Sequence, residues 1–228
     1  MQLFKREPMD TTAARQAIFA RIRKAQNRLP EPEQAELDEV AHYLAQHEGG
    51  PRPAIGSDLV ERFRQQALRT SQTMDEVDNF NDVPAAAARY LAGMGLGTKA
   101  IAWQTLTELP WQQSGLEVAF RPPVNEDMVG ITGCFCAVAE TGTLMMLSGA
   151  QTYASAALLP ETHIAIVPVQ RILGSIEDAF KLAQSERGVL PRATNFISGP
   201  SRTGDIEQTI VLGAHGPYRV HLILVRDI

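Results

Sequence analysis

The chain has 228 residues, of which 44% are hydrophobic and 21% are charged, as is ordinary for a folded globular protein. A chain of this length can bury a core large enough to fold without disulfides. The formal net charge of −5 argues against nucleic acid or an anionic membrane as the main partner. No apolar run is long enough for a membrane span, and residues 1–8 lack the apolar core of a signal peptide. We therefore expect a cytoplasmic protein.

The cysteine content limits the redox chemistry of the chain. Cys134 and Cys136 are the two cysteines, and a disulfide between such close neighbours would be strained, so we expect free buried thiols. An iron–sulfur cluster is commonly held by four cysteines, so any such cluster is expected on a partner protein. No cluster of residues has zinc-ligand spacing. We expect neither a bound metal nor a cofactor.

The first third of the chain is polar and has the pattern of helices. Apolar residues recur at helical spacing in two stretches, namely Ala14, Ile18, Ile22 and Ala25, and then Leu37, Val40, Ala41 and Leu44. The Gly/Pro cluster at residues 49–53 then interrupts the pattern. We predict a helical N-terminal region over residues 1–53 and an α/β domain over residues 54–228. Ser57 is the predicted cap of the first helix in that domain.

From about residue 80 the pattern changes to alternating helices and strands. Val83-Pro84 opens a helix that runs through Leu91. A second helix is predicted over residues 172–183. Strands are predicted over residues 99–103, 116–120, 131–139, 143–147, 163–169 and 219–225, the third and fourth forming a hairpin. This alternation predicts an α/β fold with a mostly parallel sheet.

The first candidate binding segment is Glu140–Thr143, which follows a strand predicted to be buried. Open α/β sheets bind ligands beyond the carboxyl ends of their strands. Gly142 would let a ligand approach the backbone, and the hydroxyls of Thr141 and Thr143 can donate to an anion. Glu140 could act as a base in proton transfer, as a nucleophile or as a simple hydrogen-bond acceptor. The same residues also fit a plain tight hairpin, in which Gly142 has a positive φ and Glu140 is exposed.

The second candidate segment is rich in hydroxyls and has the composition of an anion-binding loop. It contains Gly199, the hydroxyls of Ser198, Ser201 and Thr203, and the guanidinium of Arg202. Backbone N–H groups in such a loop can hold a carboxylate or phosphate, and an arginine can bind the anion through two hydrogen bonds.

A structural interpretation of this loop remains open. Ser198 and Ser201 would then satisfy the backbone of a turn, and Arg202 would pair with Asp205 or Glu207. In the binding interpretation, Asp205 and Glu207 also belong to the ligand site.

The third candidate segment is a turn that contains a histidine. His215 lies between Gly213 and Gly216, and an imidazole in such a loop can act as acid or base. Gly216 is a candidate ligand-binding residue. His215 could equally bond within its own turn. His163 and His221 alternate into apolar strands, so we expect them to be structural residues with satisfied hydrogen bonds.

These segments carry a family resemblance. Ala139–Thr143, Ser198–Glu207 and Gly213–Pro217 are similar to motifs of the LUD-domain family, and within it to those of the lactate-utilisation proteins. The resemblance covers about residues 85–228. It implies a fold like that of the ribose-5-phosphate isomerase, glucosamine-phosphate deaminase and CoA-transferase group. It also implies a role in oxidising lactate to pyruvate with iron–sulfur and oxidoreductase partner proteins.

The leading hypothesis is a cytoplasmic component of a lactate-oxidising system. The three segments would form a cleft for a small carboxylate or phosphate, or for an anionic group of a partner protein. Arg202 would bind the anion, and Glu140 and His215 would transfer protons if the chain is catalytic, which the sequence leaves open.

Two other hypotheses remain. An autonomous enzyme of the sugar-phosphate isomerase or acyl/CoA-transfer type would use the same cleft. A non-catalytic scaffold would instead dock partner proteins. Its sign would be an exposed apolar patch on the N-terminal helices, rimmed by Arg15, Arg21 and Lys24.

Overall fold

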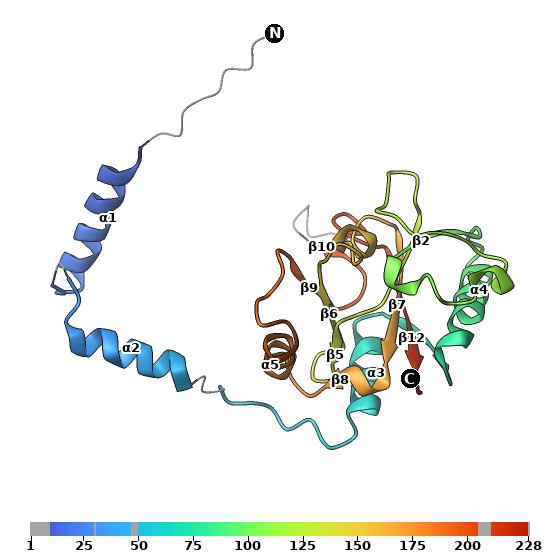
Figure 1. Cartoon of the computed structure of the whole chain (residues 1–228), viewed down its shortest axis with the longest axis horizontal. Helices are drawn as coiled ribbons and strands as arrows, with labels where there is room; N and C mark the ends of the chain where they lie inside the picture. The colour runs from blue at the N-terminus through green and yellow to red at the C-terminus, as the bar shows by residue number, and fades with distance from the viewer. Residues whose placement is uncertain (1–9, 30, 47–49, 205–210, 228) are drawn as a thin grey trace, which may run out of the picture. The chain divides into compact units, whose positions relative to one another are not determined.

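The computed structural model describes residues 10–29, 31–46, 50–204 and 211–227, in two compact units that divide after Pro51. The first unit contains α1 (Thr12–Ala25) and α2 (Gln34–Gln46), and neither helix has a buried residue. The second, called the α/β unit below, contains all the other elements (Figure 1). The helical N-terminal region is confirmed. The behaviour of residues 1–53 and 54–228 as separate domains stays a prediction.

The larger sheet of the α/β unit is parallel throughout. Its six strands lie in the order β1 (Thr73–Val77), β12 (Arg219–Val225), β7 (Thr162–Pro168), β4 (Val129–Thr132), β2 (Lys99–Ala102) and β3 (Glu117–Ala119). The two central strands β12 and β7 are apolar along most of their length, because a parallel strand covered on both faces buries every side chain. The predicted α/β fold with a mostly parallel sheet is confirmed.

A second, mixed sheet contains the hairpin. Its order is β8 (Ile172–Leu173), β5 (Cys136–Val138), β6 (Thr143–Leu147) and β9 (Thr194–Ile197), and only the first pair is parallel. The predicted hairpin is therefore confirmed, as β5 and β6. A single strand over residues 131–139 is wrong, because the chain leaves the six-stranded sheet after Thr132 and enters the second sheet at Cys136. Outside both sheets, β10 (Arg202–Thr203) and β11 (Val211–Leu212) form an antiparallel pair.

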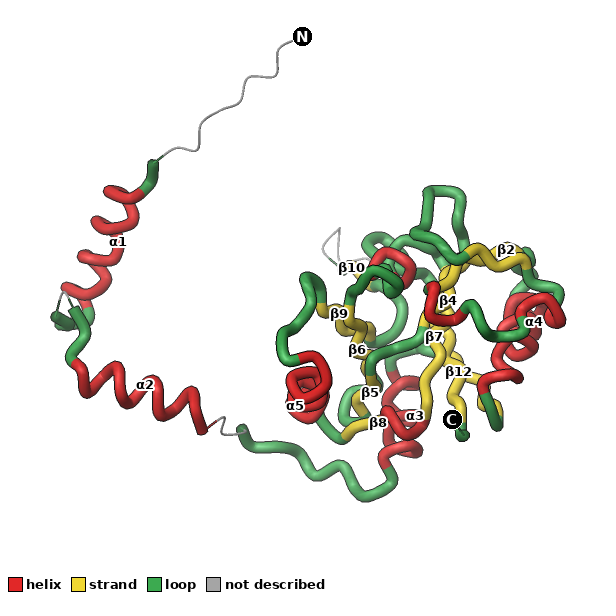
Figure 2. Tube along the Cα trace, viewed as in Figure 1, coloured by secondary structure: helices red, strands yellow, loops and turns green. Residues whose placement is uncertain are grey.

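Three α-helices cover the sheets of this unit, namely α3 (Leu59–Arg69), α4 (Val83–Gly93) and α5 (Ile176–Arg187). Figures 1 and 2 show α4 and α5 on the outer sides, with both sheets between them. The predicted start of α5 at Ile172 is wrong, because Ile172 and Leu173 pair with β5 and Ser175 caps the helix. Short 3₁₀ turns cover 80–82, 104–106, 111–114, 154–157 and 169–171. None of the described helices combines the length and apolarity needed to cross a membrane.

The hairpin is buried on both sides, which explains its apolar sequence. Leu144 and Met146 belong to the main core, which lies between the two sheets and extends under α3 and α4. Met145 and Leu147 face the opposite way, into a smaller core that Ala179 and Ala183 of α5 complete. Successive residues of a strand point to opposite faces, so a strand between two cores must be apolar at every position.

Helix α3 begins one residue later than predicted. Its cap is Asp58 rather than Ser57, and the Asp58 carboxylate accepts a hydrogen bond of 3.0 Å from the backbone N–H of Glu61. The helix buries Phe63 and Ala67 completely in the main core. Its C-terminal turn lies at the candidate site described below.

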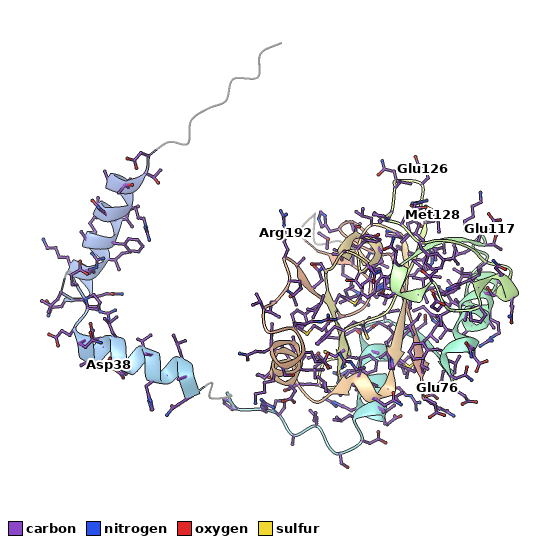
Figure 3. All side chains as sticks on the ribbon, viewed as in Figure 1. Asp38, Glu76, Glu117, Glu126, Met128 and Arg192 are labelled. Atoms are coloured by element: carbon purple, nitrogen blue, oxygen red, sulfur yellow. The ribbon has the colours of Figure 1, made fainter. Side chains whose placement is uncertain are left out.

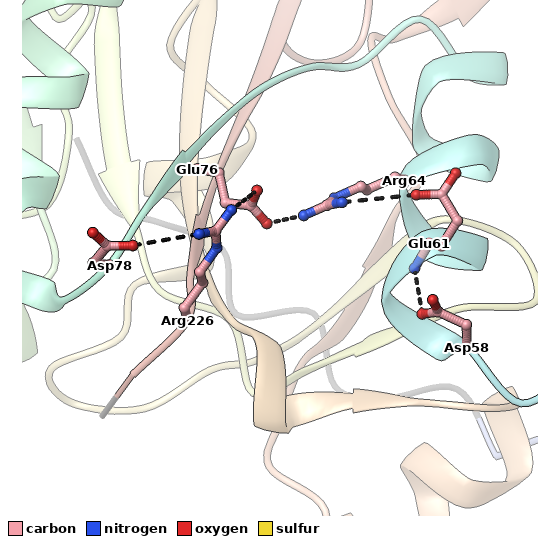
Figure 4. Close-up of polar contacts among 6 residues, drawn as sticks. All are labelled: Asp58, Glu61, Arg64, Glu76, Asp78 and Arg226. Atoms are coloured by element: carbon pink, nitrogen blue, oxygen red, sulfur yellow. Dashed lines mark hydrogen bonds and ion pairs between the residues drawn. The ribbon is translucent and has the colours of Figure 1, made fainter.

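Ion pairs connect α3 to the edge of the six-stranded sheet (Figure 4). Arg64 of α3 pairs with Glu76 of β1, and Glu76 also accepts from Arg226, which follows β12, at 2.8 Å. Arg226 lies 3.5 Å from Asp78 as well. Ion pairs that stay partly open to solvent contribute at most about 1 kcal/mol each, so these pairs add little to the stability of the fold.

Two buried histidines are only half satisfied, whereas satisfied side chains were predicted. His163 is fully buried, with Nε2 2.8 Å from the Thr132 hydroxyl, and its Nδ1 has no partner among the described residues. His221 lies with Nδ1 2.9 Å from the Thr73 hydroxyl, and its ring stacks on Tyr90 at 3.8 Å between centroids. Its Nε2 likewise finds no partner in the part of the chain that the structure describes. Burial lowers the pKa of each imidazole to about 4.

These histidines predict a loss of stability in mild acid. The unfolded chain binds a proton on each near pH 6.5, whereas the folded chain does so near pH 4. The free energy of unfolding should therefore fall as the pH drops from about 6.5 to 4. His221→Phe keeps an aromatic ring on Tyr90 and removes one titrating group, so its melting temperature should fall less over this range. An equal fall in both proteins would contradict the assignment.

Candidate functional site

The core of the candidate site is a chain of three hydroxyls, which we call the hydroxyl cluster. Thr141 and Thr143 are linked by a hydrogen bond of 2.7 Å between their Oγ1 atoms, and Thr143 Oγ1 lies 2.6 Å from Ser198 Oγ. Leu144 of β6 pairs with Ile197 of β9, and this register places the neighbouring Thr143 and Ser198 side by side. Thr143 is buried and Ser198 is exposed, so the chain of hydroxyls leads from the interior to the surface.

The C-terminal turn of α3 packs directly on both loops of this cluster. Gly142 has φ +68°, and a Cβ there would lie 2.4 Å from the Ala67 nitrogen. Gly199 has φ +90°, and a Cβ there would lie 2.1 Å from the Thr70 carbonyl oxygen. The backbone of α3 and its C-terminal turn thus fills the space beside both glycines. That a ligand approaches the backbone at Gly142 stays a prediction.

Gln72 fixes this arrangement from within. Its Nε2 donates to the Gly142 carbonyl at 2.8 Å and to Thr70 Oγ1 at 2.9 Å. The side chain is 2% exposed, and its Oε1 has no partner in the described part of the chain. One buried acceptor therefore remains unused beside the cluster.

Ser71 connects the α3 turn to Arg202. Ser71 follows the end of α3 and has φ +63°, a conformation in which glycine is the usual residue. Its exposed hydroxyl accepts a hydrogen bond from Nη2 of Arg202. Neither Ser71 nor Gln72 was identified from the sequence. The sequence held one signal for Ser71: no glycine follows α3, so another residue has to adopt the positive φ at the end of this helix.

The third segment is held against the second through Ser201. The Ser201 N–H donates to the Pro217 carbonyl and the Ser201 carbonyl accepts from the Gly213 N–H, both at 2.9 Å. Ser201 Oγ accepts from the backbone N–H of His215 at 3.3 Å, and a Cβ at Gly216 would lie 3.3 Å from Ser201 Cβ. The His215 side chain is exposed. The structure thus brings the Ser198–Thr203 and Gly213–Pro217 segments together by backbone contacts.

Other predicted residues are not joined to this network. Glu140 is half-buried, its N–H donates to the Gly174 carbonyl at 3.1 Å, and within the described residues its carboxylate has no hydrogen-bond partner. Thr203 pairs with Val211 in the β10–β11 ribbon. Asp205 and Glu207 lie outside the described residues. Among the described residues, Glu140 and His215 are not joined by a hydrogen bond.

The position of Glu140–Thr143 differs from the expected one. We predicted the carboxyl end of a strand in the parallel sheet, but β5 belongs to the mixed sheet and turns back antiparallel into β6. The interpretation as a tight hairpin with a positive φ at Gly142 is confirmed, although Glu140 is half-buried rather than exposed.

The surface beside the hydroxyl cluster is polar. Ser198, Arg202 and His215 are all exposed, and the first two present a hydroxyl and a guanidinium at the surface. Among the described residues, no group of three or more His, Cys, Asp or Glu side chains is placed to hold a metal ion. Burial raises the pKa of Cys134 to about 12 and that of Cys136 to about 11, so both thiols stay protonated at neutral pH.

Comparison with known proteins identifies the family. The model of the LUD domain matches residues 94–225. A protein from Exiguobacterium named lactate utilization protein C is 32% identical over 186 residues, which cover 77% of this chain and 81% of the relative. The chain belongs to the LUD-domain family. The resemblance predicted from the three motifs is thereby confirmed.

Other relatives match a shorter part of this LUD-domain protein. Lactate utilization protein C 1 of Bacillus mycoides is 42% identical over 102 residues, and lactate utilization protein C of Bacillus subtilis is 40% identical over 102 residues. Each alignment covers 43% of this chain, and it spans 44% and 42% of the respective relative. The α3 turn with Ser71 and Gln72 precedes the residues that the LUD-domain model matches.

A solved structure shows the same fold. The crystal structure of a DUF162 family protein from Deinococcus radiodurans superposes with a TM-score of 0.57 at 20% identity. The match covers 76% of this chain and 99% of that one. At this identity the likeness shows the fold alone.

The close fit at Gly142 predicts a large effect of adding one methyl group. Gly142→Ala should lower the free energy of unfolding by about 2–5 kcal/mol, because a positive φ disfavours a Cβ and the α3 backbone must move. Gly133→Ala is the matched control, since its Cβ would meet the Trp103 ring at an ordinary 3.7 Å and its φ is not positive. Urea unfolding of both variants measures the difference. Equal stabilities would show that α3 does not constrain the hairpin turn.

Proposed function

We propose that the chain is a component of a cytoplasmic system that oxidises L-lactate to pyruvate, and that the hydroxyl cluster with Arg202 binds an anionic group. The family and the printed names of the relatives support the first part. The observation that carries the second part is the placement of Arg202. Ser71 holds its guanidinium beside loops that bring Ser198 and Thr143 together.

The exposure of this surface favours a partner protein over a free small molecule. Sites for small molecules enclose most of the ligand surface, whereas Ser198, Arg202 and His215 are exposed. An exposed arginine with a neighbouring hydroxyl suits a carboxylate on the surface of an iron–sulfur or oxidoreductase partner. The backbone of the site is constrained by α3, so little order has to be gained on binding.

Substitutions at Arg202 and Ser71 test this proposal. Arg202→Ala removes a charge-assisted contact of about 1.5–3 kcal/mol, so affinity for an iron–sulfur partner should fall about tenfold or more. The melting temperature should change little, because Arg202 is exposed. Ser71→Ala should weaken binding less, by removing only the group that orients Arg202. Biolayer interferometry with the purified partner measures both effects.

Two further variants serve as controls. Ser71→Gly also removes the hydroxyl but suits the positive φ, so it should bind as Ser71→Ala does and be more stable by about 1 kcal/mol. Arg192→Ala removes another exposed arginine, which projects from the surface of the α/β unit, and should bind as the unmodified protein does (Figure 3). Unchanged binding by Arg202→Ala with a clearly lower melting temperature would make Arg202 a structural residue. Titration with L-lactate and pyruvate tests the small-molecule alternative.

One observation also favours the scaffold hypothesis. The apolar residues of α1 and α2 are exposed, with Ile18 at 57%, Ile22 at 44% and Leu44 at 61%. Arg15, whose guanidinium lies 5.4 Å from the ring centroid of Phe19, is one of the basic residues on α1. Exposed apolar side chains on a helix that also carries basic residues suit an interface with an acidic rim on a partner protein.

Charged substitutions on this face distinguish docking from folding. Ile18→Glu combined with Ile22→Glu should weaken partner binding about tenfold or more, without lowering the melting temperature, because α1 buries no side chain. Val189→Glu, at a residue that is 82% exposed in the α/β unit, is the control and should leave binding unchanged. Full binding by the α1 variant would exclude this face as the docking surface.

A further inference from the structure

The chain leaves β2 and β4, two neighbouring strands of the six-stranded sheet, toward opposite sides of the sheet, so a crevice is expected beyond their carboxyl ends. After β2 the chain continues to β3, on one side, whereas after β4 it continues through the hairpin to β7, on the other side. When the connections after two neighbouring parallel strands lead to opposite sides of the sheet, the loops at the carboxyl ends of these strands separate. Ligands of open α/β sheets bind at this place.

A cavity of about 400 Å³ lies at this crevice, and we call it the edge cavity. Trp103, which follows β2, lines it, as do Gly133, Cys134 and Phe135, which follow β4. Pro168, the last residue of β7, closes a further side. The volume is that of sites for small organic molecules.

The edge cavity lies at the opposite end of the hairpin from the hydroxyl cluster. Phe135 and Leu147 line the cavity where β5 begins and β6 ends, whereas Thr141 and Thr143 lie at the turn between these strands. The two sites share no residue. The edge cavity is therefore a separate place from the surface to which the proposed function assigns binding.

The charged residues that line the edge cavity are both cationic. Arg171 is neutralised by Glu186, through hydrogen bonds of 2.6 and 3.0 Å, and its Nε donates to the Phe135 carbonyl at 2.9 Å. Arg187 makes no ion pair within the described residues, and its guanidinium lies 5.9 Å from the centre of the Phe135 ring. Arg187 thus leaves the cavity with a net positive charge.

The remaining walls are apolar or weakly polar. Phe135 and Trp103 line it with the small part of their rings that is not buried, and Thr105 and Thr152 add hydroxyls. Cys134 stays a neutral thiol, because burial raises its pKa to about 12. No aspartate or glutamate lines the cavity among the described residues. An apolar chamber with one unneutralised arginine suits a molecule that is apolar at one end and anionic at the other.

We propose that the edge cavity binds a small organic anion, with its carboxylate or phosphate on Arg187 and its apolar body against Phe135 and Trp103. The two aromatic side chains come from loops after different strands, so the ligand bridges the carboxyl ends of β2 and β4. Arg187, at the end of α5, binds the anionic group at the mouth of the cavity, because its side chain is exposed.

Three simple probes test this proposal on the full chain by isothermal titration. Benzoate carries a carboxylate on a benzene ring, and phenyl phosphate carries a phosphate on the same kind of ring. Benzamide is the neutral analogue of benzoate. A fragment of this size should bind with a Kd on the order of 1 mM. At least one anion should bind about tenfold more tightly than benzamide, and the tighter anion identifies the preferred group. Binding of neither anion, or equal binding of benzamide, overturns the proposal.

Substitutions at the edge cavity test whether the probe binds there. Arg187→Ala should weaken binding of the preferred anion about tenfold, whereas Arg192→Ala should change it by less than about twofold. Gly133→Leu should abolish binding, because its side chain fills the cavity next to Trp103, and circular dichroism checks its fold. Equal losses in the two arginine variants overturn the proposal, and so does full binding by folded Gly133→Leu. Should Gly133→Leu not fold, the arginine pair decides.

Discussion

The C-terminal turn of α3 reaches the hydroxyl cluster only because glycine occupies positions 142 and 199. Backbone atoms of Ala67 and Thr70 stand where a Cβ would lie at these positions, and both glycines have a positive φ. The contact joins three segments that are far apart in sequence, and it brings Ser71 to Arg202 and Gln72 to the hairpin turn. Much of the candidate surface is thus a product of backbone packing, with its polar groups held in fixed positions.

The hairpin of β5 and β6 gives the α/β unit two distinct chemical environments. Its turn carries the hydroxyl cluster, and its open end borders the edge cavity beside Phe135. The strands between are buried on both faces, in the main core and against α5. A protein interior is packed too densely to deform smoothly, so a shift of the hairpin along its axis would affect both ends. The same two strands therefore border the polar surface at one end and the edge cavity at the other.

The sequence predicted the elements whose signals are local. Val83-Pro84 marks the start of α4, and the apolar runs at 163–169 and 219–225 are the central strands, because burial on both faces leaves a continuous apolar pattern. It did not predict the break between Thr132 and Cys136, since both sides of the break are buried and equally apolar. The sequence drew attention to Gly142 and Gly199, but it did not show that α3 packs on them. That packing joins residues more than 70 positions apart.

The same limit applies to the candidate sites. The rule that ligands bind at carboxyl ends of parallel strands was applied to Glu140–Thr143, whereas the cavity at that edge is lined by Trp103, Phe135 and Arg187. These three residues share no motif, and they meet only in the folded chain, because they come from the loops after β2 and β4 and from the end of α5. Ser71 was missed for a related reason, because its conformation depends on the helix end and its partner lies 131 positions away. The hydroxyl-rich loops were found because their composition is itself unusual.

The place of β12 in the sheet also sets the order in which the protein can assemble. This strand comes last in the sequence, yet it lies between β1 and β7, and β1 pairs with no other strand in the described sheet. During synthesis, pairing can begin among β7, β4, β2 and β3. Strand β1 has no partner until residues 219–225, which form β12, have left the ribosome. Until then the edge of β7 has unpaired N–H and C=O groups on an apolar strand, which is a template for aggregation. The pairing of β1 with β12 joins residues nearly 150 positions apart, and long-range pairing of this kind slows folding.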